Sequence, residues 1–171
     1  MATVREIEQS LFSWAPRESA MDWDNVGHLV GDPEREVTRV LVALDITERV
    51  AQEAVGLGAQ LIVSHHPVMN VRWHEREMQT LRPDTRLGGL LTMLVKNDIS
   101  AICMHTNLDA ADGGVNDCLA QKLGLNGIFP LNDEKIGRIG TLSCEKGLEE
   151  FLRDVIELLG CGGLRYCRGS G

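Results

Sequence analysis

The chain has 171 residues, of which 43% are hydrophobic, and a formal net charge of -8 at pH 7. This length suits one well-packed domain, and we expect residues 1–171 to form a single α/β domain. The net acidity, with no basic block to offset it, argues against binding to nucleic acid or to an anionic membrane surface. No apolar run is long enough to span a membrane, and the first residues lack the pattern of a signal peptide.

Five cysteines are scattered along the chain, and none belongs to a Cys-x-x-Cys pair. An odd number of cysteines without such pairs is typical of reduced thiols in a cytosolic protein. We therefore expect a cytoplasmic location.

The N-terminal pattern predicts an amphipathic helix over residues 3–12. Its apolar residues form one stripe, and Thr3 with Glu6 makes a capping box at its start. Residues 21–33 then mix carboxylates and glycines with a short apolar stretch. A turn is the plain interpretation of Asp24 and its neighbours.

A strand–helix–strand pattern follows. The first apolar strand covers residues 40–44 and ends at Asp45. Thr47 can cap the next helix, which leads to a second strand over residues 59–63. Right-handed crossover makes such strands parallel, and continuous apolar strands are typical of a sheet covered on both faces. The sequence therefore predicts a three-layer α/β sandwich, with a largely parallel or mixed sheet between helices. Asp45 is either a carboxylate that orients a metal ligand or a turn residue.

The second strand runs directly into Ser64-His65-His66-Pro67. Pro67 ends the strand and holds the residue before it in the extended region. Two imidazoles are thus placed at the carboxyl end of a buried strand, where open α/β sheets bind ligands. This placement favours metal ligation. Neighbouring side chains on extended backbone point apart, so the two histidines either turn together onto one ion or serve different ions of a close pair.

A second polar cluster, residues 105–109, follows the predicted strand 100–104. Asp109 is the natural carboxylate partner of His65 and His66, because divalent ions need anionic oxygen to offset their charge. The three side chains should converge on a metal site.

Two further histidines could transfer protons near neutral pH. His105 begins the second cluster, where it could orient the site or donate to a substrate. His74 lies in the charged segment after the histidine pair, in a region that could form a lid. A metal site with these residues could perform metal-assisted hydrolysis of a small molecule.

Four motifs occur in the order and spacing of one family: Asp24-Asn25-Val26-Gly27, Val42-Ala43-Leu44-Asp45, Ser64-His65-His66-Pro67 and His105-Thr106-Asn107-Leu108-Asp109. From about Asp22 onwards the chain resembles the dinuclear-metal-centre, interacting-factor-3-like family, often described as type 2 homologues of GTP cyclohydrolase I. The resemblance implies two divalent ions per subunit, bound in part by His65, His66 and Asp109. It also implies a homohexameric ring and a nucleotide-like substrate. The metal stays open among Zn, Fe, Mn, Ni and Co.

The family's remaining two ligands, a His and a Glu four residues further on, lie beyond the last residue of this chain. The resemblance therefore implies that residues 1–171 are the N-terminal part of a longer chain and bind metal poorly alone. The alternative to a hydrolase is a non-catalytic metal-binding or regulatory hexameric scaffold. Ligation needs the same residues in both cases.

Overall fold

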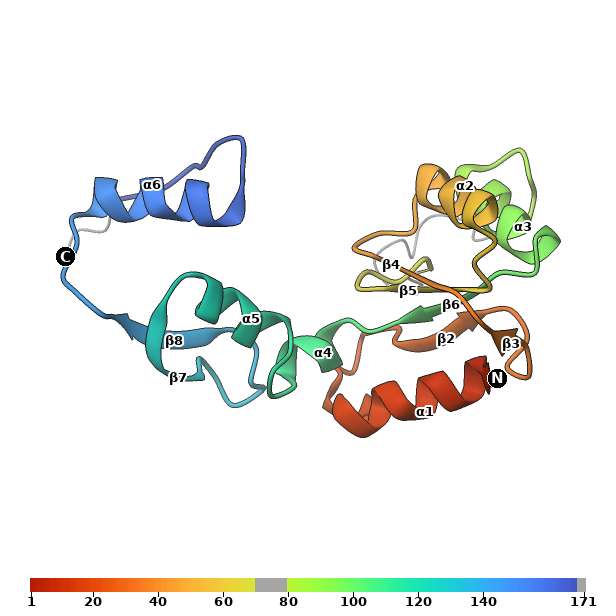
Figure 1. Cartoon of the computed structure of the whole chain (residues 1–171), viewed down its shortest axis with the longest axis horizontal. Helices are drawn as coiled ribbons and strands as arrows, with labels where there is room; N and C mark the ends of the chain where they lie inside the picture. Colours follow the sequence, from red (N-terminus) through yellow and green to blue (C-terminus); the bar gives the residue numbers. More distant parts are fainter. Residues whose placement is uncertain (70–79, 169–171) are drawn as a thin grey trace. The chain divides into compact units, whose positions relative to one another are not determined.

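The computed structural model describes residues 1–69 and 80–168. The elements shown in Figure 1 belong to two compact units, Met1–Ala111 (unit 1) and Asp112–Gly171 (unit 2). The two are described separately below, and the single domain expected from the sequence stays a prediction. No helix in the described ranges is long and apolar enough to cross a membrane.

Unit 1 is built on a four-stranded sheet in the order β2-β6-β5-β4. The strands are β2 (Gly27–Val30), β4 (Val40–Ala43), β5 (Leu61–Ser64) and β6 (Ser100–Cys103). The three strands β4, β5 and β6 are parallel, whereas β2 runs antiparallel to β6 at one edge. The sheet is therefore mixed. Two short strands, β1 (Ala2–Thr3) and β3 (Glu36–Val37), pair separately.

Helices cover both faces of this sheet. Helix α1 (Val4–Trp14) lies on one face, and α2 (Glu48–Leu57) and α3 (Arg86–Lys96) lie on the other (Figure 1). Because successive side chains of a strand point to opposite faces, Leu61 packs in the core under α1, whereas Ile62 packs with α2 and α3. The three-layer α/β sandwich predicted from the sequence is confirmed.

Local signals determine where the helices begin and end. The hydroxyl of Thr3 accepts a hydrogen bond from the backbone N–H of Glu6 at 3.2 Å, and the Glu6 carboxylate accepts one from Thr3 at 2.9 Å. This is the predicted capping box. The hydroxyl of Thr47 accepts from the N–H of Val50 at the start of α2, and α2 is followed by Gly58 in the left-handed conformation.

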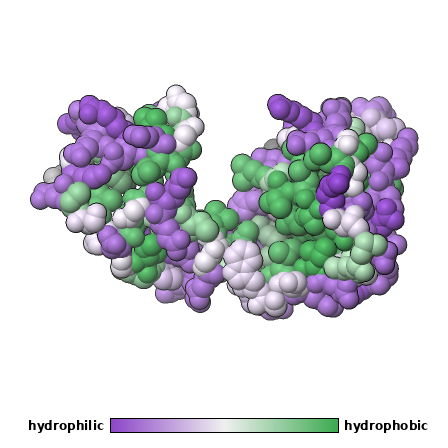
Figure 2. Space-filling model, in the orientation of Figure 1, coloured by the Kyte–Doolittle hydropathy of each residue, from purple (hydrophilic) through white to green (hydrophobic). Residues whose placement is uncertain are grey.

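The edge strand β4 differs from the prediction. Its continuous apolar sequence is typical of a strand covered on both faces, yet three alternate side chains are exposed: Val40 by 41%, Val42 by 76% and Leu44 by 61%. Apolar side chains reach the surface over this strand in Figure 2. The covered strands are β5 and β6, because they occupy the middle of the sheet.

Unit 2 contains α5 (Val115–Lys122), a hairpin of β7 (Leu125–Pro130) with β8 (Arg138–Leu142), and α6 (Leu148–Leu159). Among its described residues, Ala120 is the only hydrophobic one that is buried. An ion pair crosses this small core. Arg138 of β8, with a side chain only 4% exposed, bonds to Asp117 of α5, which also accepts from the N–H of Gly113 at 2.6 Å.

This ion pair should make the stability of unit 2 depend on pH. The hydrogen bond from Arg138 holds the pKa of Asp117 below its usual range, although burial opposes the shift. The pair's contribution is therefore complete above the usual pKa of about 3.9 and is lost as the pH falls through the lowered one. We expect Asp117→Asn to reduce the free energy of unfolding at pH 7 by about 1–3 kcal/mol and to remove this acid dependence.

Amide hydrogen exchange in α5 and β8 measures the effect locally. Glu34→Gln is a matched control, because it breaks the Arg5–Glu34 pair, whose side chains are 52% and 64% exposed. That change should cost less than about 1 kcal/mol. Exchange in unit 2 that is identical for Asp117→Asn and the natural chain at pH 7 would contradict this role of the buried pair.

Candidate metal centre

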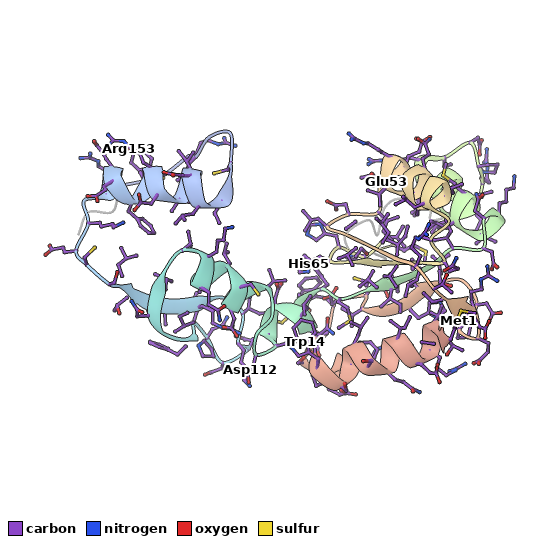
Figure 3. The ribbon with its side chains drawn as sticks, in the orientation of Figure 1. Met1, Trp14, Glu53, His65, Asp112 and Arg153 are labelled. Atoms are coloured by element: carbon purple, nitrogen blue, oxygen red, sulfur yellow. The ribbon has the colours of Figure 1, made fainter. Side chains whose placement is uncertain are left out.

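The register of the sheet brings the two histidine motifs together. Strands β5 and β6 pair in parallel with Ser64 opposite Cys103, and the N–H of Met104 bonds to the carbonyl of Ser64 at 2.9 Å. His65 follows β5 directly and is labelled in Figure 3, and His105 follows β6 by one further residue. Both motifs therefore lie at the carboxyl edge, as predicted.

Three imidazole rings gather at this edge. The ring centroids are 5.1 Å apart for His65 and His66, 5.0 Å for His65 and His105, and 5.5 Å for His66 and His105. One ligand atom from each ring lies within 4.8 Å of the other two. Two nitrogens bound to a single ion at about 2.1 Å lie at most about 4.2 Å apart, so small side-chain rotations would let the three share an ion. The adjacent histidines thus turn together rather than apart.

Each ring is held through Nδ1 by an oxygen that can only accept. The acceptors are the Met104 carbonyl for His65 at 3.0 Å, Asp45 for His66 at 2.8 Å, and Asp24 for His105 at 2.9 Å. Because carbonyl and carboxylate oxygens accept, Nδ1 must carry the proton in all three rings. The lone pair is then on Nε2, and metal-binding histidines are typically held in this way.

Asp24 is the more buried of the two carboxylate acceptors: its side chain is fully buried, whereas that of Asp45 is 53% exposed. It also accepts from the backbone N–H of Thr106 at 3.0 Å, from the Thr106 hydroxyl, and from the N–H of Asn25 at 2.7 Å. Burial raises the pKa of Asp24, but the hydrogen bonds from His105, Thr106 and Asn25 outweigh it and lower the pKa to about 2. Asp24 is therefore ionised at neutral pH.

Two asparagines connect the site to its surroundings. The fully buried Asn107 accepts from the N–H of His105 at 3.0 Å and donates to the carbonyl of Ala15, just after α1, at 2.8 Å. Asn25 donates to the carbonyl of Met69 at 2.6 Å. Helix α4 (Thr106–Ala110), which follows β6, and the segment after the histidine pair are thereby fixed to the N-terminal region.

The predicted site residues fall into three groups. His65 and His66 come together, and His105, predicted to transfer protons, lies in the same cluster. Metal ligation by His65 and His66 stays a prediction. Asp109 is beside the cluster, with its Oδ1 3.8 Å from Nε2 of His65, and its role as a ligand stays a prediction. His74 lies outside the described residues.

Sequence reasoning missed the role of Asp24 and left that of Asp45 open. Asp24, interpreted as a turn residue, is the buried partner of His105, 81 residues away. Asp45 bonds to Nδ1 of His66, and this contact favours its interpretation as an orienting carboxylate over that as a turn residue. The signal for Asp24 was its position in one of the four motifs that carry the family resemblance.

A three-layer α/β unit with a histidine cluster at its carboxyl edge is the architecture of a candidate metal-binding protein. Comparison with known families identifies the family of the chain. Residues 2–171 match the model of Duf34/NIF3 (NGG1p interacting factor 3), and the chain belongs to this family.

Relatives in this family are longer than the chain. A GTP cyclohydrolase 1 type 2 homolog of Clostridium perfringens is 41% identical over 158 residues, which are 89% of this chain and 58% of the relative. A protein of the same name from Streptomyces coelicolor is 44% identical over 131 residues, 77% of this chain and 44% of its own. The chain therefore spans about half the length of the curated relatives it matches.

Solved structures share the fold. A hypothetical protein of Staphylococcus aureus superposes with a TM-score of 0.83 at 28% identity, covering 95% of this chain and 66% of that one. Reduced HcgD from Methanocaldococcus jannaschii gives a TM-score of 0.78 at 30% identity, covering 91% of this chain and 60% of that one.

The buried amide of Asn107 should be important for the stability of unit 1. Asn107→Ala removes the buried hydrogen bonds that Asn107 makes to the N–H of His105 and to the carbonyl of Ala15, which should cost about 2–4 kcal/mol. Unfolding followed by tryptophan fluorescence measures this, because every tryptophan precedes Asp112.

Asn97→Ala is the matched control. Asn97 lies at the end of α3 and bonds to the Met93 carbonyl at 2.8 Å in an exposed setting. Its loss should cost less than about 1 kcal/mol. Equal effects of the two substitutions would show that burial of the Asn107 amide is unimportant.

Proposed function

We propose that this chain binds divalent metal through His65, His66 and His105, and that the metal-loaded whole protein hydrolyses a nucleotide-like small molecule. The observation that carries the proposal is the convergence of three imidazoles, each held through Nδ1. Asp109 supplies a nearby carboxylate. The resemblance and the names of the relatives support a substrate of the GTP class and two ions per subunit.

The donor set fits such ions. Neutral imidazole with carboxylate suits Zn, Fe, Mn, Ni or Co, and geometry alone does not select one of them. Three carboxylates near the rings offset the positive charge: Asp24 and Asp45 through their hydrogen bonds, and Asp109 at 3.8 Å from His65. The net charge of the chain, -8, acts in the same direction.

The histidines and the carboxylates have different roles in the proposed site. The three rings would hold the ion, and their hydrogen-bonded carboxylates would fix the direction of each Nε2. A bound divalent ion would supply Lewis acidity and lower the pKa of a bound water. Proton transfer is the alternative role for His105. Proton transfer by His74 is a proposal that rests on the sequence alone.

We extend the proposal to the setting of the protein. The family resemblance supports a homohexamer with a small-molecule substrate. The scattered cysteines support a cytoplasmic location, and the net charge of -8 argues against a nucleic-acid or membrane partner. The alternative, a non-catalytic metal-binding or regulatory scaffold, draws on the same histidine cluster.

Metal binding can be tested with Co²⁺, whose absorption spectrum reports its ligands. We expect the chain alone to bind Co²⁺ weakly but measurably, and His65→Ala, His66→Ala and His105→Ala each to weaken the affinity further, at least about tenfold. His28→Ala is the control, because His28 lies in β2 and bonds to the carbonyl of Val30 at 2.7 Å. Its affinity should match that of the natural chain.

Two results would change the proposal. Unchanged affinity in all three variants would refute the histidine site. If His105→Ala alone keeps full affinity while losing turnover in the whole protein, His105 is a proton carrier and not a ligand.

Hydrolysis requires the whole, metal-loaded protein. We expect turnover of at least one compound in a panel of purine nucleotides and phosphoesters, with loss of turnover on chelation and recovery on adding metal back. Chromatographic detection of products measures this. Metal-loaded protein that converts nothing in the panel would favour the scaffold alternative.

A further inference from the structure

The side chain of Asp24 is fully buried and bonds directly to the ring of His105, a member of the histidine cluster. We infer that Asp24 is a positioning residue, which holds the His105 ring so that Nε2 faces His65 and His66. The inference rests on the proposed metal site for its purpose, but the geometry of Asp24 can be tested without any metal.

The contact between the two side chains is close on both oxygens. Nδ1 of His105 lies 2.9 Å from Oδ1 and 3.0 Å from Oδ2 of Asp24. The Asp24 side chain is fully buried and that of His105 is 8% exposed, so water competes little for this bond. In such surroundings the hydrogen bond fixes both the ring plane and the position of its proton.

The carboxylate is itself prevented from turning. Its oxygens also accept from the N–H and the hydroxyl of Thr106 and from the N–H of Asn25. The Thr106 hydroxyl in turn accepts from the N–H of Met21 at 2.9 Å. A carboxylate with four donors around it has one orientation, and it transmits that orientation to the ring.

The same short segment also holds the other histidine motif. Asn25, the next residue, donates to the carbonyl of Met69, three residues after His66. Asp24 and Asn25 therefore connect the turn after β6 with the segment after β5. Residues 21–25 thus contact the segments that follow both strands, although they belong to neither strand.

Asp45 provides an internal comparison. It makes the same type of bond to His66 at 2.8 Å, but its side chain is 53% exposed and that of His66 is 42% exposed. Water can replace Asp45 as the acceptor, so its removal should disturb its ring much less. If Asp24 acts by position, Asp24→Asn and Asp45→Asn should differ in size of effect although the chemical change is identical.

The Asp24→Asn substitution keeps the shape and changes the hydrogen bonding. An amide offers one acceptor oxygen to donors that met two carboxylate oxygens. If that oxygen faces Thr106, the amide NH₂ faces His105, and Nδ1 must then accept. The proton moves to Nε2, and the lone pair no longer faces the cluster.

The experiment is nitrogen NMR of the metal-free chain with ¹⁵N-labelled histidine, at a pH of about 8, above the reference pKa of about 6.5 for imidazole in model peptides. We expect His105 in the Nδ1–H tautomer in the natural chain and a shift towards Nε2–H in Asp24→Asn. Asp45→Asn should leave His105 unchanged. In Co²⁺ titrations, Asp24→Asn should weaken binding by about 10–100-fold and Asp45→Asn by less.

The outcomes separate the two claims. His105 in the Nε2–H tautomer in the natural chain overturns the inference without any variant, and so does an unchanged tautomer in a folded Asp24→Asn chain. An equal loss of Co²⁺ affinity in Asp24→Asn and Asp45→Asn also overturns it. A natural chain that binds no Co²⁺ overturns the proposed function, whereas the tautomer measurement still tests Asp24.

Discussion

The parallel, in-register pairing of β5 with β6 is the constraint on which the candidate site depends. It places the residues after Ser64 beside those after Cys103, so that His65 and His105 meet although they are far apart in the chain. A slip of one residue would turn the side chains of a strand to the opposite face and take one motif away from the other. The cores on both faces of the sheet oppose such a slip, because each strand buries apolar side chains on both sides.

The hydrogen-bond acceptors that hold the three rings differ in kind and in exposure to solvent. A backbone carbonyl holds His65, a half-exposed Asp45 holds His66, and a fully buried Asp24 holds His105. The fold therefore orders these rings before any ligand binds, and the His105 ring is the most firmly held. The half-exposed His66 is the ring with the greatest freedom to adjust to what binds.

The two units differ in how they are stabilised. Unit 1 has apolar cores on both faces of its sheet, whereas unit 2, among its described residues, buries one hydrophobic residue, Ala120. Specific polar contacts therefore contribute a larger share of the stability of unit 2, and the Asp117–Arg138 pair is the clearest of them. The histidine cluster lies in the better-packed unit, where positions of side chains are more strongly determined.

The sequence by itself determined what depends on neighbours along the chain. The capping box at Thr3, the helix between Thr47 and Gly58, and the placing of both histidine motifs at strand ends follow from local hydrogen bonding and apolar periodicity. The tertiary structure alone decided that β4 is an exposed edge, that the rings of His65 and His66 turn together, and that Asp24 is the partner of His105. These depend on strand order and on contacts across as many as 81 residues, which no local pattern encodes.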